Sequence, residues 1–325
     1  MLKAPFPWFG GKSRAIELVW PRLGNVLNYV EPFAGSLAML LGRPHDPSVE
    51  TVNDRDCYLS NFWRSITTDP LKVARYADWP VSECDLRARH RWLCQRKVFR
   101  ERMLQDPHYH DAKIAGWWVW GISQWIGAGW CSRPEWIGRG QGGRAPRGLN
   151  ASIQLSSTMG VHVLDGMNKR PVINRGSRGV TNPPHQIQEW MIALFNRLRN
   201  VRVCCGDWAR ILTPSCTWKL GGGQLTAVFL DPPYAHAMRD KRLYSIEADI
   251  SAEVRTWAVA NGGNPRLRIA LCGLAGEHEM PAGWEMASWH PARGYSKKAR
   301  RREVIWFSPA CLKQENLFTR TECEQ

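Results

Sequence analysis

An acid, two prolines and an aromatic residue follow an apolar run in residues 225–234, LTAVFLDPPY. The β-branched and aromatic residues of the run predict a buried strand, and open α/β sheets bind their ligands at the carboxyl ends of such strands. Each proline lacks an N–H and has a nearly fixed φ, so the turn is stiff and the carbonyls of Pro232 and Pro233 cannot pair as in an ordinary strand. The segment therefore predicts a row of hydrogen-bond acceptors, beginning with Asp231, beside the aromatic face of Tyr234.

These acceptors suit a reaction at the exocyclic amine of a nucleobase. Such an amine is a poor nucleophile because its lone pair is delocalised into the ring. If the Asp231 carboxylate and the Pro232 carbonyl accepted its two hydrogens, they would favour a pyramidal nitrogen and stabilise the positive charge that develops on it. Tyr234 could then stack on the base. The alternative is a strand followed by an ordinary Asp-Pro turn, and other segments have to decide between the two.

The composition favours a polyanionic partner. The 325 residues include 44 lysines and arginines against 29 acids, a formal net charge of +15. Neutralised phosphates release counterions, so this balance predicts binding to nucleic acid. A solvated basic surface without such a role is the alternative. The length suffices for one large α/β domain with an insertion, or for two domains.

The ten cysteines show no metal-binding pattern, because none of them forms a C-x-x-C pair. No metal is expected. No charged segment followed by an apolar run opens the sequence, which predicts a cytoplasmic protein with mostly reduced thiols. The tryptophan-rich residues 116–130 are too few to cross a bilayer and include Ser123 and Gln124. They predict a buried or domain-bridging helix, and no contact with a membrane is expected.

A glycine-containing turn precedes a helical pattern in residues 5–14, PFPWFGGKSR. Gly10 and Gly11 would let the backbone approach a ligand closely, Lys12 offers a cation, and Ser13 could cap the helix. Trp8 could contact a cofactor or belong to the core. The segment is therefore a candidate for ligand binding.

A strand, a turn of small residues and a helix are predicted in residues 28–41, NYVEPFAGSLAMLL. Many α/β folds hold adenosine-containing cofactors with this geometry. The G-x-G-x-x-G fingerprint is missing, which points to a cofactor without phosphate. Further on, VETVNDRD ends another strand at Asp54, where an acid can accept hydrogen bonds from both ribose hydroxyls. Asp56 is the alternative for this role, and Asn53 fits a turn.

Four segments, WFGGKSR, YVEPFAGS, VND and FLDPPY, follow one another in this order. Together they resemble the Dam-like (D12 class, alpha group) DNA adenine N6 methyltransferases. Each segment alone is a weak indication of the family, but their order and spacing make the resemblance specific. It covers residues 1–66 and roughly 200–308. It implies an α/β fold with the Rossmann-like sheet of an S-adenosylmethionine-dependent methyltransferase, carrying an inserted, largely helical and loop-rich DNA-recognition region.

The implied domain organisation is discontinuous. Residues 1–66 and 199–309 would form the methyltransferase catalytic domain. Residues 67–198 would be an inserted target-recognition region, and residues 310–325 a tail.

The resemblance also implies a role for each matching residue. S-adenosylmethionine would be the cofactor, Asp54 would bind its ribose, and residues 206–208, Gly-Asp-Trp, would contact its adenine. The implied catalytic residues are Asp231, Pro232, Pro233 and Tyr234. The implied cofactor-binding residues are Trp8, Gly10, Gly11, Lys12, Glu31, Pro32, Phe33, Gly35, Asp54, Asp207 and Asp231. One departure is Leu37, which stands where the family usually has the second glycine of F-x-G-x-G, and its side chain could narrow the cofactor pocket.

Basic residues in two segments predict contacts with DNA. Residues 131–185 are rich in Gly, Arg, Pro, Ser and Asn, and their arginines could reach phosphates or guanine edges. The family's target recognition lies in this interval. A basic hairpin before the last strand could bind the DNA backbone, and in both places a solvated basic loop is the alternative. The candidate residues are Arg133, Arg139, Arg144, Arg147, Lys297, Lys298, Arg300 and Arg301.

The sequence therefore predicts an enzyme that transfers a methyl group from S-adenosylmethionine to adenine N6 in double-stranded DNA, with the target base flipped out of the stack. It would act in the cytoplasm of a bacterial or phage-infected cell. By resemblance, an Asp rather than a Ser before Pro-Pro-Tyr favours adenine over cytosine N4, which is the alternative target, and RNA is a less favoured substrate. Leu37 motivates a third alternative, a catalytically silent DNA-binding protein of the same fold.

Overall fold

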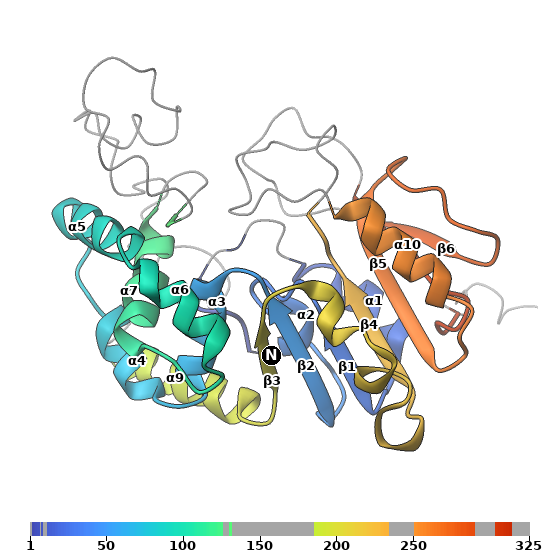
Figure 1. Ribbon diagram of the computed structural model, residues 1–325, viewed down its shortest axis with the longest axis horizontal. Coiled ribbons are helices and arrows are strands. Elements are labelled where there is room, and N and C mark those ends of the chain that lie inside the picture. Colours follow the sequence, from blue (N-terminus) through green and yellow to red (C-terminus); the bar gives the residue numbers. More distant parts are fainter. Residues whose placement is uncertain are drawn as a thin grey trace, which may run out of the picture.

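A seven-stranded, mostly parallel sheet forms the centre of the computed structural model (Figure 1). The structure describes residues 2–6, 8, 12–125, 130–131, 185–233, 250–289 and 303–313. The strand order is β3-β2-β1-β4-β5-β7-β6. The strands are β1 (Asn28–Glu31), β2 (Val49–Asp54), β3 (Arg202–Cys205), β4 (Thr226–Leu230), β5 (Leu267–Leu274), β6 (Glu285–Trp289) and β7 (Glu303–Phe307).

The direction of the strands defines one functional edge of the sheet. Strands β1 to β5 run parallel, and β7 is antiparallel to both of its neighbours. The strand order reverses between β1 and β4, and open α/β sheets bind ligands outside the carboxyl ends of the strands at such a switch point. Because β7 is antiparallel, its first residue, Glu303, pairs with Leu274 at the end of β5 and lies at this same edge. The mixed α/β architecture is compatible with the predicted Rossmann-like fold class.

Helices cover the sheet and continue beyond its β3 side. They are α1 (Ile16–Leu23), α2 (Ala38–Leu41), α3 (Cys57–Ile66), α4 (Pro70–Ala77), α5 (Glu83–Cys94), α6 (Lys97–Gln105), α7 (Ala112–Gln124), α9 (His185–Leu198) and α10 (Ser251–Asn261). Short 3-10 helices lie between β3 and β4: η3 (Trp208–Ile211), η4 (Pro214–Cys216) and η5 (Leu220–Gly222).

Two hydrophobic cores lie on opposite faces of the sheet. Tyr29 and Phe229 belong to the larger core, which includes side chains of α1, α2 and α3. Their neighbours in sequence, Val30 and Val228, belong to the smaller core with side chains of α10 and η3. Successive side chains of a strand point to opposite faces, so every second residue of a strand belongs to the same core. This coverage on both faces explains why β4, after Thr226, and β5, apart from Arg268, are almost continuously apolar.

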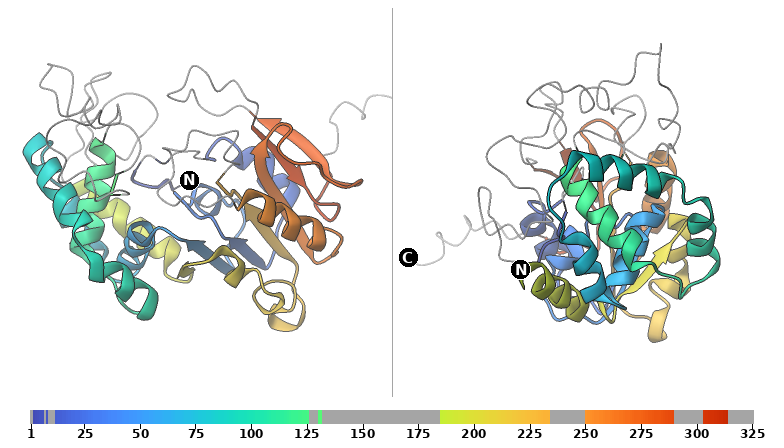
Figure 2. Two further views of the ribbon diagram at one scale, coloured as in Figure 1. Left: turned by 45° about the horizontal axis from the view of Figure 1, so that its top comes forward. Right: turned by 90° about the vertical axis from the view of Figure 1, so that its left-hand side faces the viewer.

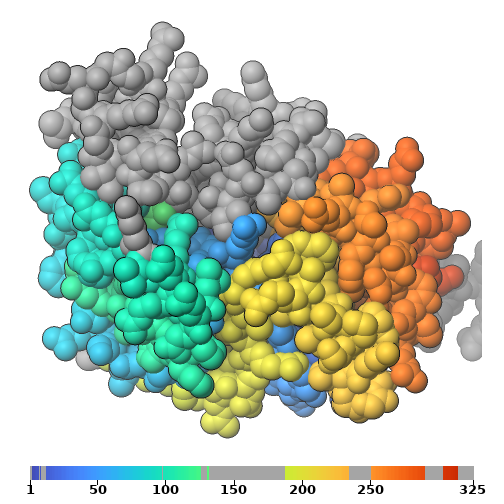
Figure 3. All heavy atoms as spheres, viewed as in Figure 1, coloured from blue at the N-terminus to red at the C-terminus, as the bar shows by residue number. Residues whose placement is uncertain are grey.

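The larger core extends from the sheet into a group of helices. The ring of Phe6 lies 5.4 Å from that of Phe62 in α3 and 5.2 Å from that of Trp118 in α7. Helix α7 packs against α3, α4 and α5, and α9 packs against α4. These helices lie beside β3, at the opposite end of the molecule from β5 and α10 (Figures 2 and 3). Trp118 and Trp120 are fully buried, so the prediction of a buried helix is confirmed for the described part of the tryptophan-rich run.

Side-chain caps explain where several helices begin. Asp56 accepts a hydrogen bond from the backbone N–H of Tyr58 at the start of α3, and Asp111 accepts from those of Lys113 and Ile114 at the start of α7. Asp69 and Ser82 cap α4 and α5 in the same way. Each cap satisfies a backbone donor that has no partner within its helix.

Leu37 adopts a left-handed backbone conformation immediately before α2. Its φ is 56° and its ψ is 26°, and its side chain is fully buried in the larger core. Glycine is the residue best suited to a positive φ because it has no Cβ. The helix that the sequence predicts from residue 37 therefore begins at Ala38, and the Leu37 side chain fills the core.

We expect glycine and alanine to rank in opposite orders at Leu37 and Leu40. Both side chains are fully buried, so each truncation should destabilise the fold by about 2–5 kcal/mol. At Leu37 glycine should be the less harmful of the two by about 1 kcal/mol, because alanine keeps the left-handed strain. At Leu40, inside α2, alanine should be less harmful by about 1 kcal/mol. Urea unfolding of the four variants measures this, and the same order at both positions would contradict a left-handed Leu37.

Two features at the carboxyl-terminal side differ from the sequence-based expectation. Strand β6 was not predicted, because its Glu285, Met286 and Ser288 are exposed at the edge of the sheet and give no apolar pattern. Part of the segment predicted as a tail packs against the sheet. Cys311 is buried, and the backbone N–H of Leu312 donates to the carbonyl of Arg22.

Of the helices that the structure describes, none combines the length and apolar character needed to cross a membrane.

Candidate functional site

Carboxylates gather at the carboxyl edge of the parallel strands. Glu31 ends β1, Asp54 ends β2, Asp207 follows β3, and Asp231 follows β4. Strands β2, β1 and β4 are direct neighbours, with Glu31 beside the switch point. The sequence predicted all four residues as site residues, and the sheet topology places them along one edge.

Asp231 is held by a buried lysine. Its Oδ2 lies 2.9 Å from the Lys12 Nζ, and the side chains are 19% and 5% exposed respectively. Burial raises the pKa of Asp231, the Lys12 charge lowers it, and the charge of Glu303 raises it. Pro232 is buried and Pro233 is half-buried, which keeps this carboxylate at the end of a stiff, partly dehydrated turn.

Lys12 also faces a second carboxylate. Its Nζ lies 3.5 Å from Oε2 of Glu303 and 5.5 Å from the ring centroid of Trp289. Trp289 and Glu303 are paired residues of β6 and β7. Sequence reasoning missed Glu303, because a single acid after an arginine run looks like surface. The sequence pattern that could have revealed it is the spacing of two and four residues from Glu303 to Ile305 and Phe307. This spacing places all three side chains on the core face of β7.

Glu31 is a buried acid whose ionisation is disfavoured. The hydroxyl of Tyr29 donates to its Oε2 at 3.0 Å, and the side chain is almost completely buried. Burial raises the pKa of Glu31 to about 8, although the hydrogen bond from Tyr29 lowers it, and the nearby charge of Asp231 raises it further. Glu31 therefore adds a polar group to the site without adding a full negative charge at pH 7.

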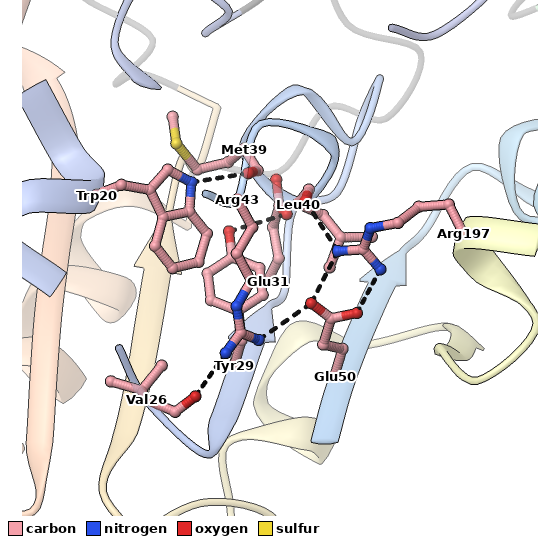
Figure 4. Close-up of polar contacts among 9 residues, drawn as sticks. All are labelled: Trp20, Val26, Tyr29, Glu31, Met39, Leu40, Arg43, Glu50 and Arg197. Carbon is pink, nitrogen blue, oxygen red and sulfur yellow. Dashed lines mark hydrogen bonds and ion pairs between the residues drawn. The ribbon is translucent and has the colours of Figure 1, made fainter. Parts of the chain in front are cut away.

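An ion-pair network behind Glu31 fixes the elements that carry it (Figure 4). Glu50 of β2 is 2% exposed and lies between two guanidinium groups. Arg43 Nη1 donates to its Oε1 at 3.1 Å, and Arg197 of α9 donates to Oε2 and Oε1 at 2.6 and 2.9 Å. Arg43 also donates to the carbonyl of Val26 at 2.5 Å. The network joins β2 and α9 to the loop before β1 and to the loop after α2.

The backbone of Leu40 connects this network to the site. Its carbonyl accepts from Arg197 Nη2 at 3.0 Å, and its N–H donates to the Glu31 carboxyl group. Helix α2 is thus tied through Leu40 both to the ion-pair network and to Glu31. The Glu31 side chain is held by this contact and by Tyr29, which preorganises it.

Asp54 organises the turn after β1. Its Oδ2 accepts from the backbone N–H of Gly35 at 3.0 Å, and its Oδ1 accepts from that of Asp56 at 2.8 Å. Burial raises the pKa of Asp54 to about 7 despite these two hydrogen bonds. The backbone N–H of Arg55 also donates to this carboxylate, which leaves about one of its four lone-pair sites for a ligand. Asp56, the alternative for the same role, uses its side chain to cap α3.

Asn53 is a positioning residue rather than the turn residue that the sequence suggested. It is buried within β2. Its Nδ2 donates to the carbonyls of Pro32 and Gly206, both at 3.1 Å. One amide group thereby ties together the turns that follow β1 and β3, on either side of Asp54.

Gly35 lies directly under the indole of Trp8. Its φ is 46°, and a Cβ at this position would stand 2.5 Å from Trp8 Nε1. Trp8 is half-buried and meets Phe6 edge-on at 6.1 Å between ring centroids. The sequence left open whether Trp8 belongs to the core or to a ligand site, and the structure places it on the core with one side against the Gly35 turn.

The remaining predicted site residues that the structure describes lie on the β3 side of the edge. Asp207 is exposed, and its Oδ1 accepts from the backbone N–H of Ala209 at the start of η3. The rings of Phe33 and Trp208 stack with centroids 6.1 Å apart. An apolar pair thus joins the turns after β1 and β3 next to the Asp207 carboxylate.

Several predicted residues lie outside the described part of the chain, and their roles stay predictions. They are Gly10, Gly11, Tyr234, Arg133, Arg139, Arg144, Arg147, Lys297, Lys298, Arg300 and Arg301.

A scan against models of protein families and a search of curated proteins found no match to this chain. Within the ranges that the structure describes, no group of three or more His, Cys, Asp and Glu side chains could hold a metal ion.

Proposed function

We propose that this chain is an S-adenosylmethionine-dependent methyltransferase that modifies the N6 amine of adenine in DNA. One observation carries the proposal: Asp231, followed by two prolines, ends the strand beside the switch point of the sheet and is partly dehydrated. A dehydrated acceptor at this place can bind the hydrogens of an exocyclic amine more strongly than water does. The resemblance of the surrounding segments to Dam-like enzymes supports adenine as the base.

The residues along the edge fit the proposed cofactor chemically. The Asp54 carboxylate keeps an acceptor site for a ribose hydroxyl beside its three backbone hydrogen bonds, and the stacked rings of Phe33 and Trp208 offer an apolar contact beside Asp207. Gly35, with no Cβ, lets the indole of Trp8 pack directly on the turn after β1, beside Asp54. When bound, S-adenosylmethionine supplies the methyl group, as a nitrogen–carbon bond forms while the carbon–sulfur bond breaks and its electrons leave with sulfur.

The chain's own residues prepare the amine. Asp231 accepts a hydrogen bond from the N6 amine, which increases the electron density on nitrogen and stabilises the positive charge that it acquires. After transfer the nitrogen loses a proton, which the Asp231 carboxylate can accept. The base must leave the DNA stack to reach this edge, and stacking on Tyr234 stays a prediction.

Exposed arginines support DNA as the partner. On the described helices α5 and α6 and between them they are Arg87, Arg91, Arg96, Arg100 and Arg102. Together with the net charge of +15, they favour attraction to a phosphate backbone.

The test of the function is direct detection of the modified base. Purified protein is incubated with unmethylated DNA and S-adenosylmethionine, and the DNA is digested to nucleosides for mass spectrometry. N6-methyladenine is the expected product. N4-methylcytosine would keep the chemistry and change the base, and cofactor binding without any modified base would favour the silent DNA-binding protein.

Asp54→Ala is expected to weaken cofactor binding by about 10-fold to 100-fold, because hydrogen bonds to a charged group contribute roughly 1.5–3 kcal/mol. Isothermal titration calorimetry with S-adenosylmethionine measures this. Asp56→Ala is the matched control: it should lose the cap of α3, at about 1 kcal/mol of stability, without changing affinity. The reverse pattern would assign the ribose role to Asp56.

A further inference from the structure

Four polar side chains share the core face of the sheet at its functional edge. Glu31, Asp231, Cys272 and Glu303 belong to β1, to the turn after β4, to β5 and to β7. Each lies two or four residues from a core residue of the same strand or its continuation, and therefore points to the same face of the sheet. These core residues are Tyr29, Phe229, Ala270 and Phe307. Leu230 pairs with Leu271 and Leu274 pairs with Glu303, so these side chains follow one another across adjacent strands.

The Lys12 ammonium lies between two of these groups. It is 2.9 Å from Asp231 and 3.5 Å from Glu303, and all three side chains are less than one-fifth exposed. Among the described residues one ammonium therefore faces two carboxylates, and ionisation of both leaves an excess of one negative charge within this group of three. Oε2 of Glu303 is buried and makes no hydrogen bond with the described residues, so among them the Lys12 ion pair is the contact that compensates its charge.

We propose that Glu303 is a positioning residue for the reaction at Asp231: through Lys12 it gives the cluster the excess negative charge that stabilises a positively charged amine nitrogen. This inference rests on the proposed function. A neutral Lys12–Asp231 pair would present little net field to the amine, whereas a cluster with a second carboxylate attracts the positive charge that develops on it.

The pKa of Asp231 depends on the other charged and titratable groups that face it. Among the residues that the structure describes they are Lys12, Glu303, Glu31 and Cys272. The Glu303 charge raises the pKa of Asp231, and Lys12 lowers it. Removing the Glu303 charge must therefore lower the pKa of Asp231, and activity that requires ionised Asp231 must extend to lower pH.

The experiment compares Glu303→Gln and Glu303→Asp with the wild-type chain and with Glu253→Gln, an exposed control on α10. Single-turnover methyl transfer is measured across pH, and the titration of Asp231 is followed by carbon-13 NMR of aspartate carboxyl groups. Asp231→Asn identifies the resonance. Thermal unfolding establishes that each variant is folded.

In Glu303→Gln we expect the maximal rate to fall about 10-fold to 100-fold, as when one preorganised group is lost from a reacting centre. The acid limb and the Asp231 titration should both move to lower pH. Glu303→Asp should recover part of the rate and stay near the wild-type titration, and Glu253→Gln should change neither.

A slower Glu303→Gln variant with an unmoved acid limb and an unmoved Asp231 titration would overturn the proposal, because a merely structural role gives that result. A wild-type protein that transfers no methyl group would overturn the proposed function. The NMR titration would still decide in that case whether Glu303 acts on Asp231.

Discussion

Asp231→Asn is expected to bind DNA and S-adenosylmethionine but to transfer methyl groups on the order of 10³-fold more slowly than the wild-type chain. Asparagine has the shape of aspartate but replaces one acceptor oxygen with a donor NH₂ group and removes the negative charge. The amine would then lose both the hydrogen-bond acceptor and the field that stabilises its positive charge. Because this interaction matters chiefly in the transition state, kcat should fall while ligand affinities change little.

The measurement is a single-turnover assay together with binding titrations for DNA and cofactor. Lys12 loses one of its ion-pair partners in this variant, so thermal unfolding has to confirm that the protein is folded. Asp46→Asn is the matched control, since Asp46 is exposed in the loop before β2, away from the carboxyl edge. Transfer by Asp231→Asn within about threefold of the wild-type rate would remove Asp231 from the mechanism.

Glu50→Gln is expected to be the most destabilising single change that preserves side-chain shape, by about 3–5 kcal/mol. Glu50 compensates two guanidinium groups, and the Arg43 side chain is fully buried. Glutamine cannot neutralise them, so the change leaves buried positive charge without a counterion. The unfolding temperature should fall by roughly 5–15 °C.

The matched control is Glu83→Gln, which removes an exposed Glu–Arg pair one helical turn apart on α5. Exposed pairs of this kind contribute about 0.5 kcal/mol or less. Urea and thermal unfolding of both variants measure the difference. Equal losses of stability would mean that the Arg43–Glu50–Arg197 network does not hold β2, α2 and α9 together.

The main strands and helices could be predicted from local patterns. The run before Asp231 forms β4, the segment ending at Asp54 forms β2, and the pattern after Ser13 forms α1. In each case a buried element needs a continuous apolar run or a periodic apolar face, and this need is written into neighbouring residues. Edge strand β6 lacks such a run because most of it is exposed.

The roles of individual site residues depended on partners far away in the chain. Asn53 looked like a turn residue, yet its amide joins the turns after β1 and β3. Leu37 looked like an obstruction in a ligand pocket, yet a left-handed backbone directs its side chain into the core. Neither the hydrogen-bond partners nor the sign of φ can be read from one residue and its neighbours.

The sequence by itself determined the acceptor turn after residue 230, the carboxylates at the strand ends and the strong positive charge, because these depend only on residue type and short-range pattern. Only the tertiary structure decided that Lys12 lies between Asp231 and Glu303. The three residues come from the segment before α1, the turn after β4 and the start of β7. Strand order and the reversed direction of β7 bring them to one edge, and that arrangement arises from long-range packing of the whole sheet.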